Sequence, residues 1–291
     1  MDLFKTDILI SNINTKTVQD KNIHLDLLRL DLIHPEISGN KWFKLKYNIA
    51  FAIENNFKSI VSFGGAYSNH LHALAFAGKE FNIKTIGIIR GEAVENQTLQ
   101  DCKKWGMDIH FISREQYREK DEVHFLKTIQ EEFKTSYIIP EGGNNMLGQK
   151  GCVEILSPAQ KEKYDLFCCS TGTGATFTGI VNALGGEKKA MGFSAIKNGH
   201  YLANEIQQQT PYLNFELQYD YHFGGFAKIN DHLKTFMQQF KSEQSFELDR
   251  VYTGKMMFGI FDLIETNSLQ ENTQILAIHT GGLQGNRTYI R

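Results

Sequence analysis

Proline is scarce in this sequence, with only 4 residues among 291, whereas glycine is common, with 25. These counts correspond to about 1% proline and about 9% glycine, against usual levels of roughly 5% and 7%. Linkers and disordered segments are rich in both residue types, so the composition excludes those classes. Abundant glycine with little proline instead predicts long regular elements joined by tight loops, in which the backbone approaches another group closely.

The chain also lacks a strong net charge and a long apolar run. Its formal net charge of -2 gives no electrostatic attraction to nucleic acid or to an anionic membrane. No apolar run approaches the roughly 18 residues that span a bilayer, and the first residues, MDLFKTDILISN, lack the apolar core of a signal peptide. With 41% hydrophobic and 22% charged residues, we expect a soluble globular protein that binds neither nucleic acid nor membrane.

Cysteine is rare, and its spacing does not suit a metal site. The four cysteines form no CxxC pair, and two of them are adjacent inside an apolar run: Cys102, Cys152, Cys168 and Cys169. Buried thiols in a reducing compartment explain this pattern better than metal ligation. We therefore expect a cytoplasmic protein without a bound metal.

Strand-like apolar runs alternate with helix-like segments along most of the chain. We expect strands at 60–63, 85–89, 108–112, 136–139, 164–169 and 274–279, and helices at 68–81, 96–105, 115–133 and up to residue 184. This alternation predicts an α/β fold whose parallel sheets are covered by helices on both faces. The segment 44–140 holds a self-sufficient set of elements, so we expect a small domain there, inserted into a larger one made of 1–43 and 141–291.

Glycines recur where predicted strands end. They form four clusters: Gly64 with Gly65, Gly142 with Gly143, Gly172 with Gly174, and Gly281 with Gly282. Tight turns alone could explain one or two of them. Ligands of open α/β sheets bind outside the carboxyl ends of the strands, so four clusters at such positions favour a ligand cleft.

The loop at residues 170–176, STGTGAT, lies between an apolar strand and a helix. Its small residues let backbone N–H groups converge on an anion at the helix N-terminus, and its threonine hydroxyls add donors. It is not a P-loop, because no Lys-Ser/Thr pair follows. It is a poor dinucleotide motif, because Phe177 replaces the third glycine and no acidic residue closes the segment 189–195. The loop predicts a site for a compact phosphate ligand, with a structural turn as the alternative.

Lys41 follows Gly39 and Asn40, which suit a turn into a helix and can project one side chain inward. Most lysines are solvated surface residues. A lysine that forms Schiff bases must instead lie near its electrophile and be partly desolvated. A phosphate site together with a placed lysine is the minimum that pyridoxal phosphate requires.

A third candidate site begins at Ser68, before a predicted helix. The structural interpretation of Ser68 is an N-cap. The serine hydroxyl, the Asn69 amide and free helix N–H groups could equally hold a carboxylate. His70 and His72 are two residues apart and do not share a helix face, so a metal pair is not expected there.

Six blocks of this sequence, in this order, resemble the fold-type II pyridoxal-phosphate enzymes. The blocks are SGNKWFKL, SFGGAYSNH, IPEGGNN, STGTGATFTG, VYTGKMMFGI and HTGGLQG. More narrowly, they are similar to the group that contains 1-aminocyclopropane-1-carboxylate deaminase and D-cysteine desulfhydrase. The resemblance implies a fold like that of tryptophan synthase β, with two open, mostly parallel twisted sheets flanked by helices. It also implies a homodimer that acts on a small amino acid.

The resemblance further implies roles for individual residues. Lys41 would carry pyridoxal 5′-phosphate as an internal aldimine and then move the Cα proton. Asn69 would bond the cofactor 3′-oxygen, and Ser68 would hold the substrate carboxylate beside His70. The remaining expected contacts are Thr173, Gly174, Ala175 and Thr176 to the phosphate, Tyr252 to the substrate, and Thr253 and Thr280 near the pyridine nitrogen.

Two positions separate the activities within this group. The deaminase pattern has an acidic residue after the VY tyrosine and a second tyrosine upstream, where this chain has Thr253 and Phe226. A carboxylate at the pyridine nitrogen strengthens the electron sink that opens a cyclopropane, whereas a thiolate leaving group needs less help. The sequence therefore favours β-elimination from a cysteine-like substrate, with D-cysteine giving pyruvate, ammonia and hydrogen sulfide.

Other functions remain open at this point. Within the fold, the alternatives are the cyclopropane deaminase and a serine dehydratase or racemase. If the chain is not an enzyme, it could be a binding protein that keeps the fold without turnover, or a nucleotide-binding protein that uses the 170–176 loop.

Overall fold

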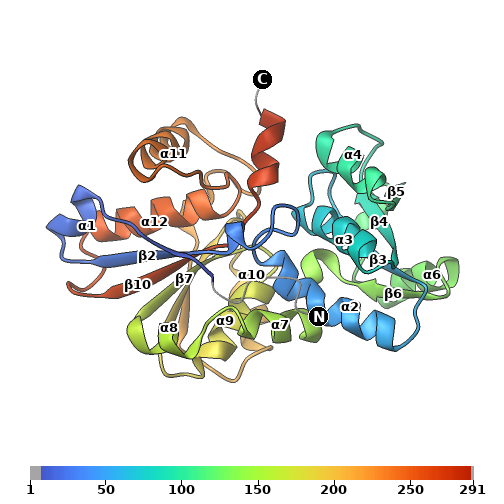
Figure 1. The fold of residues 1–291 in the computed structure, drawn as a ribbon, viewed down its shortest axis with the longest axis horizontal. Helices are drawn as coiled ribbons and strands as arrows, with labels where there is room; N and C mark the ends of the chain where they lie inside the picture. Colours follow the sequence, from blue (N-terminus) through green and yellow to red (C-terminus); the bar gives the residue numbers. More distant parts are fainter. Residues whose placement is uncertain (1–7, 290–291) are drawn as a thin grey trace.

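The computed structural model describes residues 8–289, and it consists of two sheets, each covered by helices (Figure 1). The larger sheet has the strand order β1-β2-β10-β7-β8-β9 and the smaller one β5-β4-β3-β6. Neighbouring strands in both sheets are parallel, except β1 and β2. The predicted α/β class with two mostly parallel sheets is therefore confirmed. The N-terminal seven residues of the segment taken not to be a signal peptide lie outside the described part.

Every strand that the apolar runs predict is present. The strands of the larger sheet are β1 (Ile10–Asn12), β2 (His24–Arg29), β7 (Leu166–Thr171), β8 (Lys189–Ser194), β9 (Phe215–Gln218) and β10 (Gln274–His279). Those of the smaller sheet are β3 (Ser59–Gly64), β4 (Lys84–Arg90), β5 (Asp108–Ile112) and β6 (Ser136–Ile139). The strand expected at 164–169 begins two residues later, because α8 and its C-cap extend to Tyr164.

Helices connect the strands, as crossover connections between parallel strands require. The α-helices are α1 (Lys16–Asp20), α2 (Lys41–Glu54), α3 (Asn69–Glu80), α4 (Gln97–Lys104), α5 (Arg114–Arg118), α6 (Val123–Glu132), α7 (Met146–Val153), α8 (Pro158–Lys163), α9 (Ala175–Leu184), α10 (Tyr201–Gln207), α11 (Asp231–Gln244) and α12 (Thr253–Glu265). Short 3₁₀ turns are η1 (Leu30–Leu32), η2 (Glu141–Gly143), η3 (Asp220–His222) and η4 (Leu283–Tyr289). None of the helices within residues 8–289 is long and apolar enough to cross a membrane.

The alternation of side chains along each strand builds two hydrophobic layers on the larger sheet. Cys169 faces the layer under α7 and α9, whereas Cys168 faces the layer under α11 and α12. Two further layers flank the smaller sheet in the same way. All four thiols are buried and free, as the adjacent pair in an apolar run predicts. The division of the chain into domains at residues 44 and 140 stays a prediction.

The single helix expected at 115–133 is wrong, because the chain breaks it into α5 and α6. Tyr117 and Ile129 both pack against the smaller sheet, in one cluster with Val61. They are twelve residues apart, so on one straight helix they would point about 120° away from each other. The extended backbone at Glu122 ends the helical rotation, so that Ile129 of α6 can face the same side of the sheet as Tyr117.

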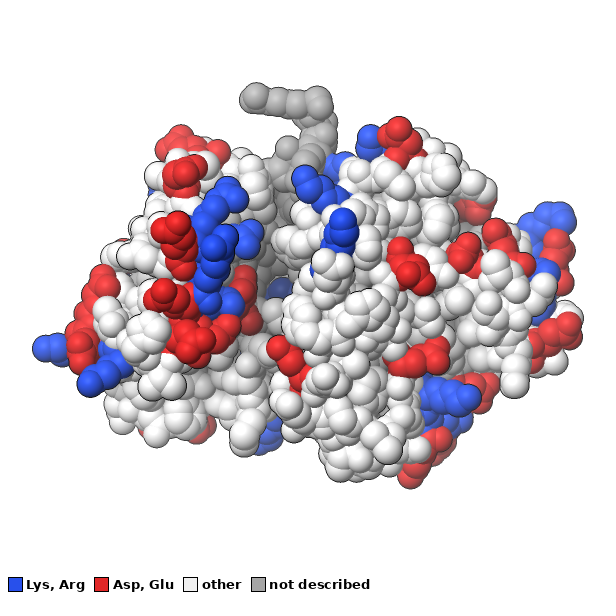
Figure 2. Space-filling model, turned by 180° about the vertical axis from the view of Figure 1, so that it is seen from behind, with Lys and Arg blue, Asp and Glu red and all other residues white. Residues whose placement is uncertain are grey.

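Charges are mixed over the surface. From behind, acidic and basic side chains lie beside one another, and the surface is hollowed between the two lobes (Figure 2). Among the described residues, no three His, Cys, Asp or Glu side chains gather where they could hold a metal ion.

One buried carboxylate ties the edge of the larger sheet to the end of α8. Asp26 is 3% exposed and accepts hydrogen bonds from Tyr164 at 2.6 Å, from Lys163 and Asn12 at 2.9 Å, and contacts His24 at 3.0 Å. Burial acts to raise the pKa of Asp26, but these hydrogen bonds outweigh it and lower the pKa to about 2.

We expect Asp26→Asn to lower the free energy of unfolding by roughly 1–2 kcal/mol at pH 7, because it removes charge-assisted hydrogen bonds. The lowered pKa means that this stabilisation is complete above about pH 4 and is lost as the pH falls towards 2. The variant should therefore have a flatter stability curve in that window, measured by urea unfolding at several pH values. Asp20→Asn, at an exposed carboxylate paired with Lys16, is the control. Equal stability losses in the two variants at pH 7 would contradict the assignment.

Candidate active site

The glycine-rich loops that follow β2, β3, β6, β7 and β10 meet at one place between the sheets. The closest approach is at Gly39, whose φ is +73°. A Cβ there would lie 1.9 Å from the carbonyl oxygen of Thr280, so no other residue fits. Elsewhere, a Cβ on Gly142 would lie 3.1 Å from Thr173, and one on Gly282 would lie 2.8 Å from the Asn69 amide nitrogen. The loops of the two sheets therefore form one cleft.

Lys41 is the first residue of α2, at the wall of this cleft. Its Nζ donates to Asn40 Oδ1 at 2.5 Å, and Asn40 Nδ2 donates to Thr176 Oγ1 at 2.7 Å. Asn40 thus joins the lysine to the loop at 170–176. Desolvation, followed by the positive charge of Lys44, lowers the pKa of Lys41 to about 7. A large part of this amine is therefore neutral near pH 7, which is the nucleophilic form.

Lys44 is a site residue that the sequence reasoning did not assign. It lies one turn after Lys41 on α2 and is only 5% exposed, and burial lowers its pKa. A Cβ on Gly143 would lie 3.1 Å from Lys44 Cβ and 3.4 Å from His70 Cε1, so these side chains border one space. The spacing of three residues from Lys41 on a predicted helix is the signal that could have found it.

The loop at 170–176 has the geometry of an anion site. Gly174, with φ of +84°, stands at the N-cap of α9, and no side chain caps the helix. The first N–H groups of α9 therefore stay available. The Thr173 Oγ1 atom is buried and has no hydrogen-bond partner within residues 8–289. A phosphate bound here would satisfy both the N–H groups and this hydroxyl, so the residues fit the phosphate of the expected cofactor.

Ser68 and Asn69 lie at the start of α3. Ser68 Oγ accepts a hydrogen bond from Leu71 N at 3.3 Å, so Ser68 is the N-cap that the structural interpretation predicts. Asn69 Oδ1 accepts a hydrogen bond from Gln284 Nε2 at 3.0 Å. This contact holds the C-terminal turn η4 against α3. The carboxylate role of Ser68 and the cofactor role of Asn69 stay predictions.

His70 is a neutral imidazole that donates a hydrogen bond through Nε2. Ser62 Oγ donates to the carbonyl oxygen of Ile139 at 2.8 Å, so it accepts from His70 Nε2 at 2.9 Å. This contact leaves Nδ1 unprotonated, buried and without a partner in the described part of the chain. Burial, then the charges of Lys44 and Lys41, lowers the pKa of His70 to about 3. A neutral imidazole cannot pair with a carboxylate as a cation, and the expected substrate contact of His70 stays untested.

Thr253 begins α12 and Tyr252 is its N-cap residue. A buried carboxylate that the sequence reasoning missed holds both in place. Asp249 is 1% exposed and accepts hydrogen bonds from the N–H groups of Val251, Tyr252 and Thr253 at 3.1, 2.8 and 2.7 Å. Asp249 stands four residues before the first residue of α12, and its carboxylate binds the free N–H groups at the start of that helix as a capping side chain would. Burial and the Asp249 charge raise the pKa of Tyr252, so its hydroxyl stays protonated. A Cβ on Gly172 would lie 3.1 Å from this hydroxyl.

The two threonines expected near a pyridine nitrogen are both buried. Thr253 is fully buried, and its Oγ1 has no hydrogen-bond partner within the described residues. Thr280 follows β10, and its Oγ1 lies 3.4 Å from Ser170 Oγ. Its carbonyl oxygen accepts from Asn40 N at 3.1 Å. Thr280 therefore links the lysine loop to the phosphate loop.

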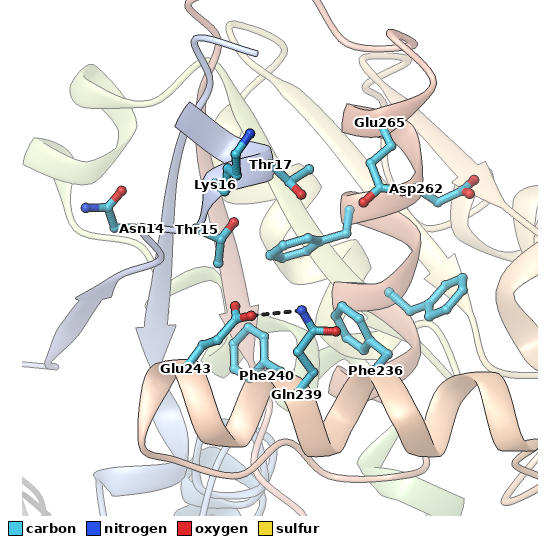
Figure 3. Close-up of a pocket in the computed structure, with 12 residues that line it drawn as sticks. Asn14, Thr15, Lys16, Thr17, Phe236, Gln239, Phe240, Glu243, Asp262 and Glu265 are labelled. Atoms are coloured by element: carbon cyan, nitrogen blue, oxygen red, sulfur yellow. Dashed lines mark hydrogen bonds between the residues drawn. The ribbon is translucent and has the colours of Figure 1, made fainter. Parts of the chain in front are cut away.

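A separate groove of about 510 Å³ lies on the outer side of α11 and α12, next to α1. Figure 3 shows side chains that line it, among them Phe236 and Phe240 of α11 and the carboxylates of Glu243, Asp262 and Glu265. It shares no residue with the glycine loops, so it is distinct from the cleft that holds Lys41.

A lysine with a lowered pKa, a helix N-terminus without a side-chain cap and two mostly parallel sheets fit an enzyme that holds a phosphorylated cofactor on an amine. The family model described as pyridoxal-phosphate dependent enzyme matches residues 14–281. The chain therefore belongs to the pyridoxal-phosphate dependent enzymes, and pyridoxal phosphate is its cofactor. The predicted family and cofactor are confirmed.

Relatives narrow the family. A protein of Pyrococcus furiosus, provisionally named 1-aminocyclopropane-1-carboxylate deaminase, is 29% identical over 289 residues, which cover 90% of this chain and 85% of that protein. The mitochondrial bifunctional D-cysteine desulfhydrase/1-aminocyclopropane-1-carboxylate deaminase of Arabidopsis thaliana is 28% identical, over 88% and 72% of the two chains. The crystal structure of an ACC deaminase homologue superposes with a TM-score of 0.82 at 25% identity, over 96% of this chain and 90% of that chain. The chain is thus a fold-type II enzyme that is similar to proteins named for 1-aminocyclopropane-1-carboxylate deaminase and for D-cysteine desulfhydrase.

We expect Lys41 to be the residue that carries the cofactor, because among the described lysines it combines a lowered pKa with a hydrogen bond to the phosphate loop through Asn40. Borohydride reduction of the holoenzyme followed by peptide mapping should place the pyridoxyl mass on Lys41. Lys41→Ala should lose the absorbance of protein-bound cofactor. Lys46→Ala, on the same helix but paired with Glu154, should keep it. A pyridoxyl group on Lys44 in the wild-type protein would overturn the assignment.

The rate at which apoenzyme captures pyridoxal phosphate should rise with pH through about 7 and level off above about 8, because only the neutral amine attacks the aldehyde. The charge of Lys44 disfavours protonated Lys41, so Lys44→Met should raise the pKa of Lys41 and move the midpoint to higher pH. Stopped-flow absorbance measures this rate, with Lys46→Met as control. A midpoint that stays in place in Lys44→Met would show that Lys44 does not set the pKa.

Proposed function

We propose that this enzyme eliminates the β-substituent of a cysteine-like amino acid, with D-cysteine as the leading substrate. The reaction converts D-cysteine and water into pyruvate, ammonia and hydrogen sulfide. The observation that carries this choice is the start of α12. Thr253 offers a neutral hydroxyl there, and the nearby carboxylate of Asp249 is already occupied by three backbone N–H groups.

The second supporting observation is aromatic. Phe226 packs edge-on against Tyr252, with the ring centroids 5.9 Å apart, and it brings no hydroxyl to this wall of the cleft. Of this pair, only Tyr252 can offer a phenol hydroxyl to a substrate. Such a wall suits an apolar, polarisable β-substituent such as a thiol better than chemistry that requires two phenol groups.

The chain's own residues divide the work. The N-terminus of α3, with Ser68, is aimed to hold the substrate carboxylate. The Lys41 amine, with its lowered pKa, can accept the Cα proton and return one later. Tyr252 stays protonated and can donate to the departing sulfur. Pyridoxal phosphate, when bound, supplies the electron sink that stabilises the negative charge at Cα.

A second candidate is the opening of 1-aminocyclopropane-1-carboxylate, because relatives of this chain carry that name. The two reactions need different strengths of electron sink, so we expect one enzyme to favour one of the two substrates. Assays with each substrate therefore distinguish the two functions. The preference for the D-enantiomer, a homodimeric state and a cytoplasmic location are also proposals, and they rest on the resemblance and on the four buried free thiols.

We expect the purified holoenzyme to release sulfide and pyruvate from D-cysteine in equal amounts, and to act at least tenfold less efficiently on L-cysteine, D-serine and the cyclopropane amino acid. A methylene-blue assay measures sulfide, and keto acids are separated by chromatography of their hydrazones. Formation of 2-oxobutyrate from the cyclopropane without sulfide from D-cysteine would replace the first candidate with the second. Absence of product from every amino acid, with the cofactor bound, would indicate a binding protein.

A further inference from the structure

Residues 223–227, which carry Phe226, adopt an unusual backbone. Phe223, Gly224, Gly225 and Ala227 all have positive φ angles, of 51°, 94°, 114° and 57°. Phe223 and Ala227 have side chains, and such residues rarely adopt this conformation unless their surroundings hold them in it. Something outside the segment must therefore determine its shape.

Lys255, on the neighbouring helix α12, supplies that restraint. It lies on the first turn of α12 and is only 2% exposed. Its Nζ donates to the carbonyl oxygens of His222 and Gly225, both at 2.8 Å. The same two carbonyls accept the turn hydrogen bonds of Gly225 N and Lys228 N, at 3.0 and 3.1 Å. One buried ammonium therefore closes both turns of the segment.

Aromatic contacts dock the segment on the same helix at two further points. Phe223 packs edge-on against Phe258 with the centroids 4.9 Å apart, and Phe226 does so against Tyr252 at 5.9 Å. Phe226 itself is 55% exposed, so its own burial does not fix its place. Burial lowers the pKa of Lys255 to about 8, against the opposing effect of Asp249, so most of the amine still carries its charge at pH 7.

We propose that Lys255 is a positioning residue: it holds residues 222–227 through two carbonyl groups and thereby sets Phe226 against Tyr252 at the wall of the substrate cleft. The expected effect of Lys255 on substrate binding rests on the proposed function, whereas its restraint of the backbone at 222–227 does not. Lys255 does not touch the reacting atoms, so its loss acts through Phe226 alone.

Hydrogen exchange tests the restraint without any substrate. In Lys255→Met holoenzyme, the amides of 222–228 should exchange at least tenfold faster than in wild type, with the rest of α12 unchanged. The matched control is Lys161→Met, because Lys161 Nζ also donates to a backbone carbonyl, that of Ala183, but outside the cleft. Unchanged exchange in 222–228 would overturn the proposal.

Steady-state kinetics test the consequence for substrate. Lys255→Met should raise KM for D-cysteine at least fivefold and change kcat less than twofold, with cofactor absorbance retained. In a Phe226→Ala background the same substitution should change KM less than twofold, because the side chain that carries the effect of Lys255 to the substrate is absent. A full additional effect in that background would show that Lys255 does not act through Phe226.

Two further measurements keep the outcomes separate. If Lys255→Met does not fold, Gly224→Ala tests the segment from its own side, since a φ of +94° excludes alanine and a Cβ there meets only Lys228, at 3.4 Å. It should loosen 222–228 and raise KM in the same way, and wild-type values for both would refute the proposal. If no amino acid is turned over, the proposed function fails, and the exchange measurement still decides whether Lys255 holds the segment.

Discussion

The close contact between the loop at Gly39 and the carbonyl of Thr280 is the constraint on which the cleft depends. Asn40 N donates to that carbonyl, so the end of β10 in the larger sheet fixes the start of α2. The helix then runs beside the smaller sheet, where Leu45 and Ile49 join its core. A single backbone contact therefore sets the distance between the amine of Lys41 and the elements of the larger sheet.

Asn40 transmits this constraint to the chemistry. Its side chain accepts from Lys41 and donates to Thr176, so the amine and the anion loop are placed by one amide. The surroundings also tune the charges around this amine. Desolvation and the charge of Lys44 lower the pKa of Lys41 to about 7, so a large part of the amine is neutral near pH 7. Burial and the same lysine charges lower the pKa of His70 to about 3, so the imidazole carries no charge that would compete for an anion.

The parts of the fold that local pattern determines were predictable from the sequence. The strand at 60–63 and the helix after Ser68 agree with the structure because apolar runs and N-caps act over a few residues. The break between α5 and α6 was not predictable in this way, since it depends on Tyr117 and Ile129 reaching one face of a distant sheet. Within the site, glycine clusters indicated the loops, but Asp249 was missed, because no helix was predicted at 253–265, whose first N–H group it binds.

The alternation of Cys168 and Cys169 across the sheet has a chemical consequence for the proposed release of sulfide. Sulfide attacks oxidised sulfur, and oxidation begins at thiolates. Burial raises the pKa of Cys169 and of Cys102 to about 12 and also raises those of Cys152 and Cys168, so all four thiols stay protonated and shielded. The two adjacent thiols face different layers of the core. Under the proposed reaction, the sulfide released would meet no reactive thiolate among these four cysteines.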